Sequence, residues 1–405
     1  MKKIIILSLL LILAPGVSSG KSDADGIEIS GFVSQGYLKS SNNGFFADTE
    51  KGTFEFNELG INFMTDVTDR LRLGIQLFAR DLGQLGNDEI TLDFAYGDFQ
   101  WRDWLGIRAG EMKLVHGFYN EIKDMDMLRT NIFYGQGVYN ESWRDILALV
   151  KGAGLHGPLP MKSWGKLKYE IQIGGANIGA DSGAAALLED QVPANAPGLS
   201  ADISKVDVDH VYSGSLVWYL PVEGLRLGVT AFDTYFEATT TLNLIPGEHI
   251  LSVDAQNYVY SVEYCWENLT LASEWMITTY NLELAGRTVP QYDSVGNYAS
   301  IAYIFSQWLE MAAYYSEYYA DDDNKKGEGR FLQGQEHRAW LKDSCLSLRF
   351  NLNEHWLLKV EGHWFNGTGL LLNQDQSDPV IINNTPTYPY EKDWSLIAVK
   401  ATFAF

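Results

Sequence analysis

The residue types that most often carry catalysis or bind metals are scattered along this sequence. Its seven histidines are His116, His156, His210, His249, His337, His355 and His363. No G-x-S-x-G or H-E-x-x-H motif is present to hold a serine nucleophile or a zinc ion. Asp321, Asp322 and Asp323 could hold Ca²⁺ loosely, but such an acidic run is typical of a solvated loop tip. We therefore predict no enzyme, no metal site and no cofactor.

Charged side chains recur at every second position of segments that are otherwise apolar. Leu358 and Val360 alternate with Lys359 and Glu361, and residues 71–80 follow the same pattern. Successive side chains of a β-strand point to opposite faces, so these charges share one face. Near the centre of a bilayer, turning an Arg or Lys toward lipid costs roughly 2 to 4 kcal/mol. We therefore expect the charges to line a water-filled interior, as in a pore.

This alternation predicts an inner wall of mixed charge. Its basic residues are Arg72, Arg80, Arg108, Lys168, Arg226, Arg349, Lys359 and Lys400, and its acidic residues are Glu58, Glu170, Glu263, Glu274, Glu310 and Glu361. The basic residues concentrate in predicted strands 3 to 7 and 14 to 16, and the acidic ones in predicted strands 10 to 13. Such a separation would set a field across the lumen. In the alternative, the inward charges pair with one another and only keep the wall hydrated.

Sixteen alternating segments, most of them roughly 9 to 13 residues long, are predicted to be strands. They are 27–38, 54–64, 70–80, 90–101, 104–112, 147–156, 166–176, 207–219, 224–236, 252–264, 268–280, 295–305, 308–319, 339–350, 355–365 and 393–405. Cys265 and Cys345 fall at strands that are not neighbours, so we expect two unpaired thiols.

Loop length depends on strand parity. The connections after even-numbered strands are short, whereas those after odd-numbered strands are long: 39–53, 81–89, 113–146, 177–205, 238–251, 281–294, 320–338 and 366–392. A soluble sandwich or propeller would not segregate loop lengths in this way. We predict an all-β protein, a transmembrane antiparallel β-barrel of about 16 strands with short periplasmic turns and long extracellular loops.

Tryptophans test this topology, because aromatic rings settle at the two membrane interfaces. Seven lie beside short turns: Trp101, Trp104, Trp164, Trp218, Trp266, Trp308 and Trp356. Trp340, Trp364 and Trp394 lie at the opposite strand ends, beside long loops. Two bands of tryptophan favour a membrane barrel over a soluble fold with core tryptophans.

The termini indicate export. An apolar run over residues 4–14 follows two lysines, and cleavage after Ser19 or Gly20 fits equally well, so residues 1–20 are predicted to be a cleavable signal peptide. No linker divides residues 21–405, which we predict to form one barrel domain. The net charge of −22 argues against nucleic acid as a partner and suits acidic loops facing lipopolysaccharide.

The longest loop points to a family. A barrel of this strand count with a long loop after strand 5 resembles the Gram-negative outer-membrane porins, whose third loop folds inward and narrows the pore. By this resemblance residues 113–146 form the constriction loop, and Glu121, Asp124, Asp126 and Arg129 face the basic wall. The alternative is an ordinary external loop with surface charges.

The resemblance also implies partners. The closing aromatic residue, Phe405, resembles the C-terminal signal read by the barrel-assembly machinery, and a homotrimer in outer-membrane lipid is implied. We expect a porin for passive diffusion of small hydrophilic solutes and ions. The alternatives are a substrate-specific channel for phosphate, sugars or carboxylates, and a structural or adhesive barrel with an occluded lumen.

Overall fold

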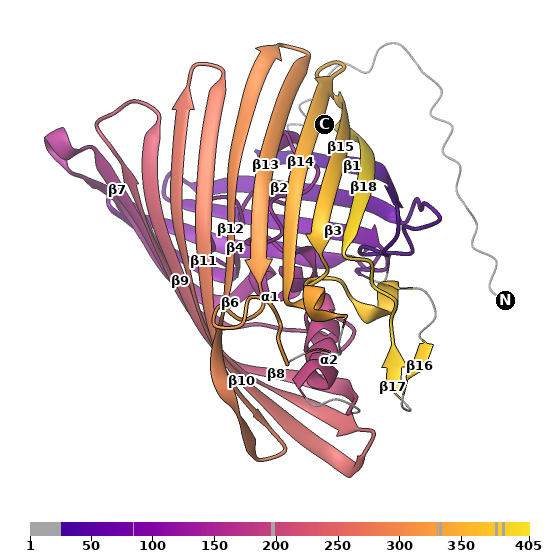
Figure 1. Cartoon of the computed structure of the whole chain (residues 1–405). Coiled ribbons are helices and arrows are strands. Elements are labelled where there is room, and N and C mark those ends of the chain that lie inside the picture. Colours follow the sequence, from indigo (N-terminus) through magenta and orange to yellow (C-terminus); the bar gives the residue numbers. More distant parts are fainter. Residues whose placement is uncertain are drawn as a thin grey trace.

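A computed structural model describes residues 26–405 except 84, 196–198, 330, 332–333, 377–379 and 383–384, so the predicted signal peptide lies outside the described residues. Within them, sixteen antiparallel strands close into one barrel, because β18 pairs with both β15 and β1 (Figure 1). These strands are β1 (Ile27–Ser40), β2 (Phe56–Thr68), β3 (Leu71–Leu82), β4 (Thr91–Arg102), β5 (Leu105–Lys113), β6 (Leu149–Pro160), β7 (Lys166–Gly175), β8 (Ala201–Tyr219), β9 (Leu225–Leu242), β10 (Ile245–Trp266), β11 (Leu269–Leu284), β12 (Arg287–Ser306), β13 (Leu309–Tyr319), β14 (Trp340–Asn351), β15 (Trp356–Gly367) and β18 (Asp393–Ala404). The predicted fold class is confirmed.

The strands form because their side chains suit lipid on one face and the interior on the other. In β18, Ile397 is 55% exposed on the outside, whereas Lys400 and Thr402 are fully buried on the inside. Phe405 follows on the outer face and is 52% exposed. Closure removes the edges of the main sheet, so every strand of the barrel has two neighbours for its backbone hydrogen bonds.

Two connections predicted as long loops are instead tight hairpins. The predicted loops 238–251 and 281–294 are wrong, because β9, β10, β11 and β12 run 16 to 22 residues and pair almost to their ends. In the first hairpin the Pro246 and Gly247 pair lies at a β-bulge of β10 rather than in a loop. In the second, Ala285 and Gly286 both have positive φ, which is typical of a two-residue hairpin turn.

The long connections after β7, β13 and β15 gather at the end of the barrel opposite the C-terminus (Figure 1) and, together with the connection after β5, contain several short elements. They are η1 (Asp126–Leu128), η2 (Glu141–Trp143), α1 (Arg144–Ala148), α2 (Gly183–Asn195), η4 (Glu336–Ala339), η5 (Asn373–Asp375) and the hairpin of β16 (Val380–Ile382) with β17 (Thr385–Thr387), while η3 (Lys162–Trp164) lies in the turn after β6. Among the described residues, no helix has the length and apolarity needed to span a bilayer.

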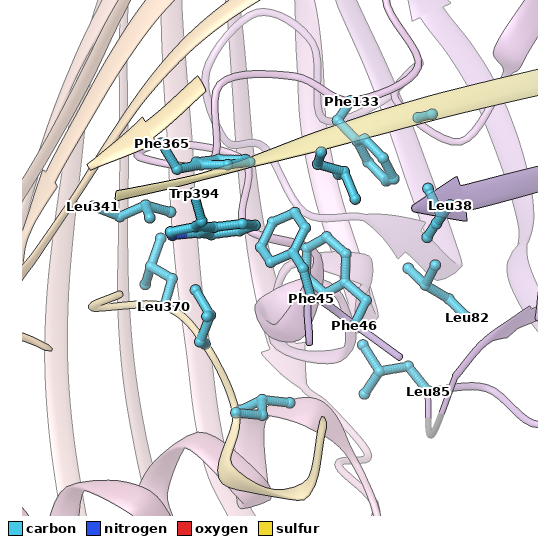
Figure 2. Close-up of a cluster of buried hydrophobic side chains, with 14 of the residues drawn as sticks. Leu38, Phe45, Phe46, Leu82, Leu85, Phe133, Leu341, Phe365, Leu370 and Trp394 are labelled. Atoms are coloured by element: carbon cyan, nitrogen blue, oxygen red, sulfur yellow. The ribbon is translucent and has the colours of Figure 1, made fainter. Parts of the chain in front are cut away.

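One part of the barrel mouth is filled by apolar side chains from several loops. Phe45 and Phe46 of the first loop lie against Phe133 of the third loop and Leu370 of the last (Figure 2). Trp394 belongs to this cluster and stacks on Phe365 with the ring centroids 3.9 Å apart. The prediction that Trp394 lies at a membrane interface is wrong, because its side chain is only 5% exposed. The loops therefore close the mouth beside β1, β18 and β15.

Candidate functional site

The third loop, residues 114–148 between β5 and β6, lies against the inner wall of the barrel. The N–H of Phe118 donates to Oε1 of Glu274 on β11 (2.7 Å), and the N–H of Ile132 donates to Oε2 of Glu361 on β15 (2.6 Å). The N–H of Gly137 donates to Oγ of Ser316 on β13 (3.2 Å). Because these strands face β5 and β6 across the barrel, the loop crosses the interior and is fastened to the opposite wall.

A further fastening is at Asp126, which has no exposed surface. Its carboxylate lies 2.9 Å from Nζ of Lys359 and 3.4 Å from Nζ of Lys400, and it accepts a hydrogen bond from Oγ1 of Thr402 at 2.6 Å. Burial raises the pKa of Asp126, but the two ammonium groups outweigh burial and hold that pKa well below its usual range. The carboxylate therefore stays ionised and anchors the loop.

Several predicted constriction and wall residues serve as fastenings of this kind. Arg129 is buried next to Asp126, and its carbonyl oxygen accepts from Nη1 of Arg349 at 3.1 Å. Arg80 pairs with Glu141 of the loop at 3.0 Å in a buried ion pair. Lys400 also pairs with Glu58.

Open space remains on the other side of the lumen, against β5 to β9. A polar cavity of about 330 Å³, which we call the turn-side cavity, reaches residues near the short turns after β6 and β8. It is lined by five predicted residues, Arg108, Glu121, Lys168, Glu170 and Arg226, together with others such as His156 and Tyr219. Arg72, another predicted wall residue, lies outside it, near the turn between β2 and β3, and pairs with Asp66 at 2.7 Å.

A second cavity, with a lining that is part polar and part apolar, lies on the loop side of the barrel. This loop-side cavity has a volume of about 230 Å³ and is lined by Arg80, Glu89, Asp93, Arg144 and Asp181, among others. Three of these residues, Glu89, Arg144 and Asp181, belong to the connections after β3, β5 and β7, which surround the same part of the mouth.

A buried ion cluster stands between the two cavities. Nζ of Lys113 lies 2.5 Å from both Oδ1 of Asp93 and Oδ2 of Asp124. Arg144 pairs with the same two carboxylates, because its Nη2 is 2.8 Å from Asp93 and its Nε is 3.1 Å from Asp124. Lys113 lines the turn-side cavity, whereas Asp93 and Arg144 line the loop-side cavity. These four residues, the ion cluster, therefore form the partition between two water-accessible spaces.

Sequence reasoning found one member of the ion cluster, Asp124, and missed the other three. Asp93 is the extra residue at a β-bulge, because Gln76 pairs with Phe94 and Leu77 pairs with Leu92. A bulge re-aims a side chain, so simple alternation gives no signal for it. Arg144 belongs to the short helix α1, whose position depends on how the third loop returns to the wall.

The wall charges are arranged mainly as ion pairs. Arg108 pairs with Asp98 at 2.8 Å and approaches Glu170 at 3.7 Å. Arg226 pairs with Glu263 at 2.8 Å. This arrangement corresponds to the alternative in which inward charges pair with one another, so it gives little support to a separated transverse field.

The mouth has a second fastening, between α2 and η5. Asp190 accepts hydrogen bonds from both the backbone and the side chain of Asn373, at 2.8 and 2.6 Å. Burial raises the pKa of Asp190 to about 6. Burial, together with the charge of Asp190, raises the pKa of nearby Asp375 to about 7. The positive charge of Arg338 partly offsets this rise in the pKa of Asp190.

This acid pair predicts a pH-dependent mouth. While α2 and η5 are in contact, both carboxyls keep their protons up to a higher pH than they would in loops that have separated. The closed arrangement of these loops is therefore most stable in acid, and its stability falls as pH rises through about 4 to 7. We expect faster proteolytic cleavage near residues 370–376 at about pH 8 than at about pH 5, once rates are corrected with an unstructured peptide substrate. Asp375→Asn should flatten the difference and the exposed control Asp322→Asn should not. Equal corrected rates in the native chain would rule out this coupling.

The barrel matches solved structures over nearly its whole length. An outer membrane protein of Vibrio cholerae called OmpT superimposes with a TM-score of 0.55 at 10% identity, covering 94% of this chain and 97% of that one. The outer membrane channel DcaP of Acinetobacter baumannii gives 0.53 at 12% identity, with coverages of 96% and 100%. The anion-selective porin from Comamonas acidovorans gives 0.54 at 11% identity, with coverages of 94% and 99%.

The chain has the porin fold. No protein-family model matches the sequence, and no curated protein sequence matches it either. Within this barrel the ion cluster joins the third loop to the wall, because Asp124 and Arg144 belong to the loop whereas Asp93 and Lys113 belong to β4 and β5.

Proposed function

We propose that this chain is an outer-membrane porin that lets small hydrophilic solutes and ions diffuse passively through a narrow path against β4 to β9. The observation that carries the proposal is the ion cluster between two cavities that both have charged side chains in their lining, one toward the short turns and one toward the long loops. The rest of the lumen is crossed by the third loop, and the mouth beside β1, β18 and β15 is filled by apolar side chains. The proposed function involves no catalysis.

The proposed path is lined by charges of both signs. Arg108, Lys168 and Arg226 face the turn-side cavity with Glu121 and Glu170, and the ion cluster itself has two acids and two bases. A small charged or strongly polar solute can exchange water for these groups as it passes, whereas an apolar solute cannot.

A substrate-specific channel is the second candidate. It is favoured by the small size of the turn-side cavity, about 330 Å³, which is in the range of a site for one small molecule. Phosphate, a sugar or a carboxylate each suits a lining that holds guanidinium, ammonium and tyrosine groups.

We propose a homotrimer embedded in outer-membrane lipid and lipopolysaccharide, inserted by the assembly machinery through the strand that ends at Phe405. One solved structure with this fold is OmpT of Vibrio cholerae in its trimer form. Mass measurement in a defined detergent, with the detergent contribution subtracted, is expected to give three chains per particle. A particle containing one chain would contradict the trimer without affecting the channel.

The deciding experiment is single-channel recording from the refolded protein in a planar bilayer under a salt gradient. Discrete current steps are expected, and the sign of the reversal potential gives the ion preference. Half-block of the current by millimolar phosphate, a sugar or a carboxylate would favour the substrate-specific channel. Absence of steps from correctly folded protein would overturn the porin proposal and favour a structural or adhesive barrel with an occluded lumen.

A further inference from the structure

Three potential metal ligands meet on the inner wall, away from the ion cluster. Cys345 on β14 and His363 on β15 are direct register partners, and Glu361 is two residues from His363 on the same face of β15. All three side chains are buried, with His363 only 1% exposed. Register and alternation thus bring together a thiol, an imidazole and a carboxylate that are 16 to 18 positions apart between the two strands.

Their ligand atoms have the spacing of a small coordination site. Sγ of Cys345 is 2.8 Å from Oε1 of Glu361, and Nε2 of His363 is 3.8 Å from the same oxygen. All three ligand atoms lie within 4.8 Å of one another. A tetrahedral zinc ion with bonds of about 2.0 to 2.3 Å separates such atoms by roughly 3.3 to 3.7 Å. Small side-chain rotations therefore suffice to seat one ion.

The histidine is oriented as a metal ligand is. Its Nδ1 lies 3.0 Å from Oδ2 of Asp343, and that carboxylate also accepts the hydroxyl hydrogen of Tyr314 at 2.8 Å. This contact places a hydrogen on Nδ1, so in the neutral imidazole the lone pair is on Nε2. Within the described part of the chain, Nε2 is buried and has no hydrogen-bond partner. Such a buried acceptor is costly unless a ligand satisfies it.

We propose that Cys345, Glu361 and His363 bind one divalent transition-metal ion, with Zn²⁺ the best match to a sulfur, nitrogen and oxygen donor set. Binding converts the Cys345 thiol to a thiolate, and its proton leaves to solvent. Asp343 stays a hydrogen-bond acceptor behind His363, and the fourth coordination position is left to water.

The site is connected to the third loop through Glu361. Its Oε2 accepts the N–H groups of Ile132 and Phe133, at 2.6 and 3.2 Å, while its Oε1 faces Cys345 and His363. An ion on Oε1 would fix the carboxylate that holds the loop. Bound metal should therefore reduce opening fluctuations of residues 131–133.

Cobalt substitution tests the site, because a thiolate bound to Co²⁺ gives a near-ultraviolet charge-transfer band. The starting protein is Cys265→Ser, which removes the exposed thiol and leaves Cys345. Metal-free, refolded barrel is expected to take up one Co²⁺ per chain with this band, and Zn²⁺ should displace it. The additional change Cys345→Ser should abolish the band, and His363→Asn should weaken binding at least tenfold. Retention of the band by the Cys345→Ser variant would overturn the assignment.

A second measurement needs no change at the site. In the Cys265→Ser protein, Zn²⁺ but not Mg²⁺ is expected to slow alkylation of Cys345 by a small maleimide at least tenfold, with a free thiol in the same solution as the control for direct effects on the reagent. Equal alkylation rates with and without Zn²⁺, together with no cobalt band at a large excess of metal, would reject the proposal. Neither measurement depends on conduction, so the metal site and the porin function can fail separately.

Discussion

Replacing Arg144 with alanine is expected to raise single-channel conductance roughly two- to fivefold and to shift ion preference toward cations. The guanidinium bridges Asp93 and Asp124 and lies over the ring of Phe78, so its removal opens the partition between the two cavities. The ion cluster then keeps two carboxylates and one ammonium group, that of Lys113, so its net charge changes from zero to negative. Conductance and reversal potential from the same bilayer recordings measure both effects.

Two control variants separate this effect from general loosening of the barrel. Arg144→Lys keeps the charge but loses the fork that spans two carboxylates, so its conductance should lie between those of the native protein and Arg144→Ala. Arg72→Ala removes an exposed ion pair far from the path and should leave conductance unchanged. If Arg144→Ala conducts like the native protein, the path does not run through the ion cluster.

Deleting residues 117–140 and joining the ends with a short Gly/Ser linker should enlarge the conductance further than any single substitution. The deletion removes the segment that crosses the lumen and its fastenings at Glu274, Ser316 and Glu361. The wall should still close, because each strand keeps both neighbours in the barrel. In a porin the deletion widens an existing pore, whereas in an occluded barrel it creates a conductance that the intact protein lacks.

The matched control is a deletion at the same mouth that spares the lumen. Removing residues 323–328 from the acidic connection between β13 and β14 should leave conductance within the scatter of the native protein. Heat-resistant migration in gels and the strand signal in circular dichroism report whether each deleted barrel has closed. A closed barrel whose conductance does not rise when residues 117–140 are removed would show that the third loop does not restrict the path.

Much of the inner wall could be predicted, because the alternation of side chains that forms it lies within each single strand. Lipid outside and polar surroundings inside impose a period of two, so Lys400 and Ile397 could be placed on opposite faces from spacing alone. The sixteen-strand closure followed from counting such segments. Strand ends were harder, since a Pro-Gly pair usually indicates a loop and here lies at a bulge inside β10.

The site could be predicted only in part because its contacts are long-range. Asp124 could be predicted because it belongs to the long third loop. Asp93, which shares Lys113 and Arg144 with it, points into the lumen only because β4 has a bulge. Trp394 was placed at an interface, since periodicity does not reveal that Phe45 of a distant loop lies beside it. The pairing of Cys345 with His363 required the register of β14 on β15.

The anchors of the third loop bear on the order of assembly. Asp126 is held by Lys359 on β15 and by Lys400 and Thr402 on β18, and β18 is the strand that closes the barrel on β1. A chain folding toward its C-terminus therefore lacks half of this binding pocket until its last strand is in place. The third loop therefore docks late, once β18 has closed the barrel. In an unfinished barrel the loop would not yet cross the lumen, so the lumen would be wider.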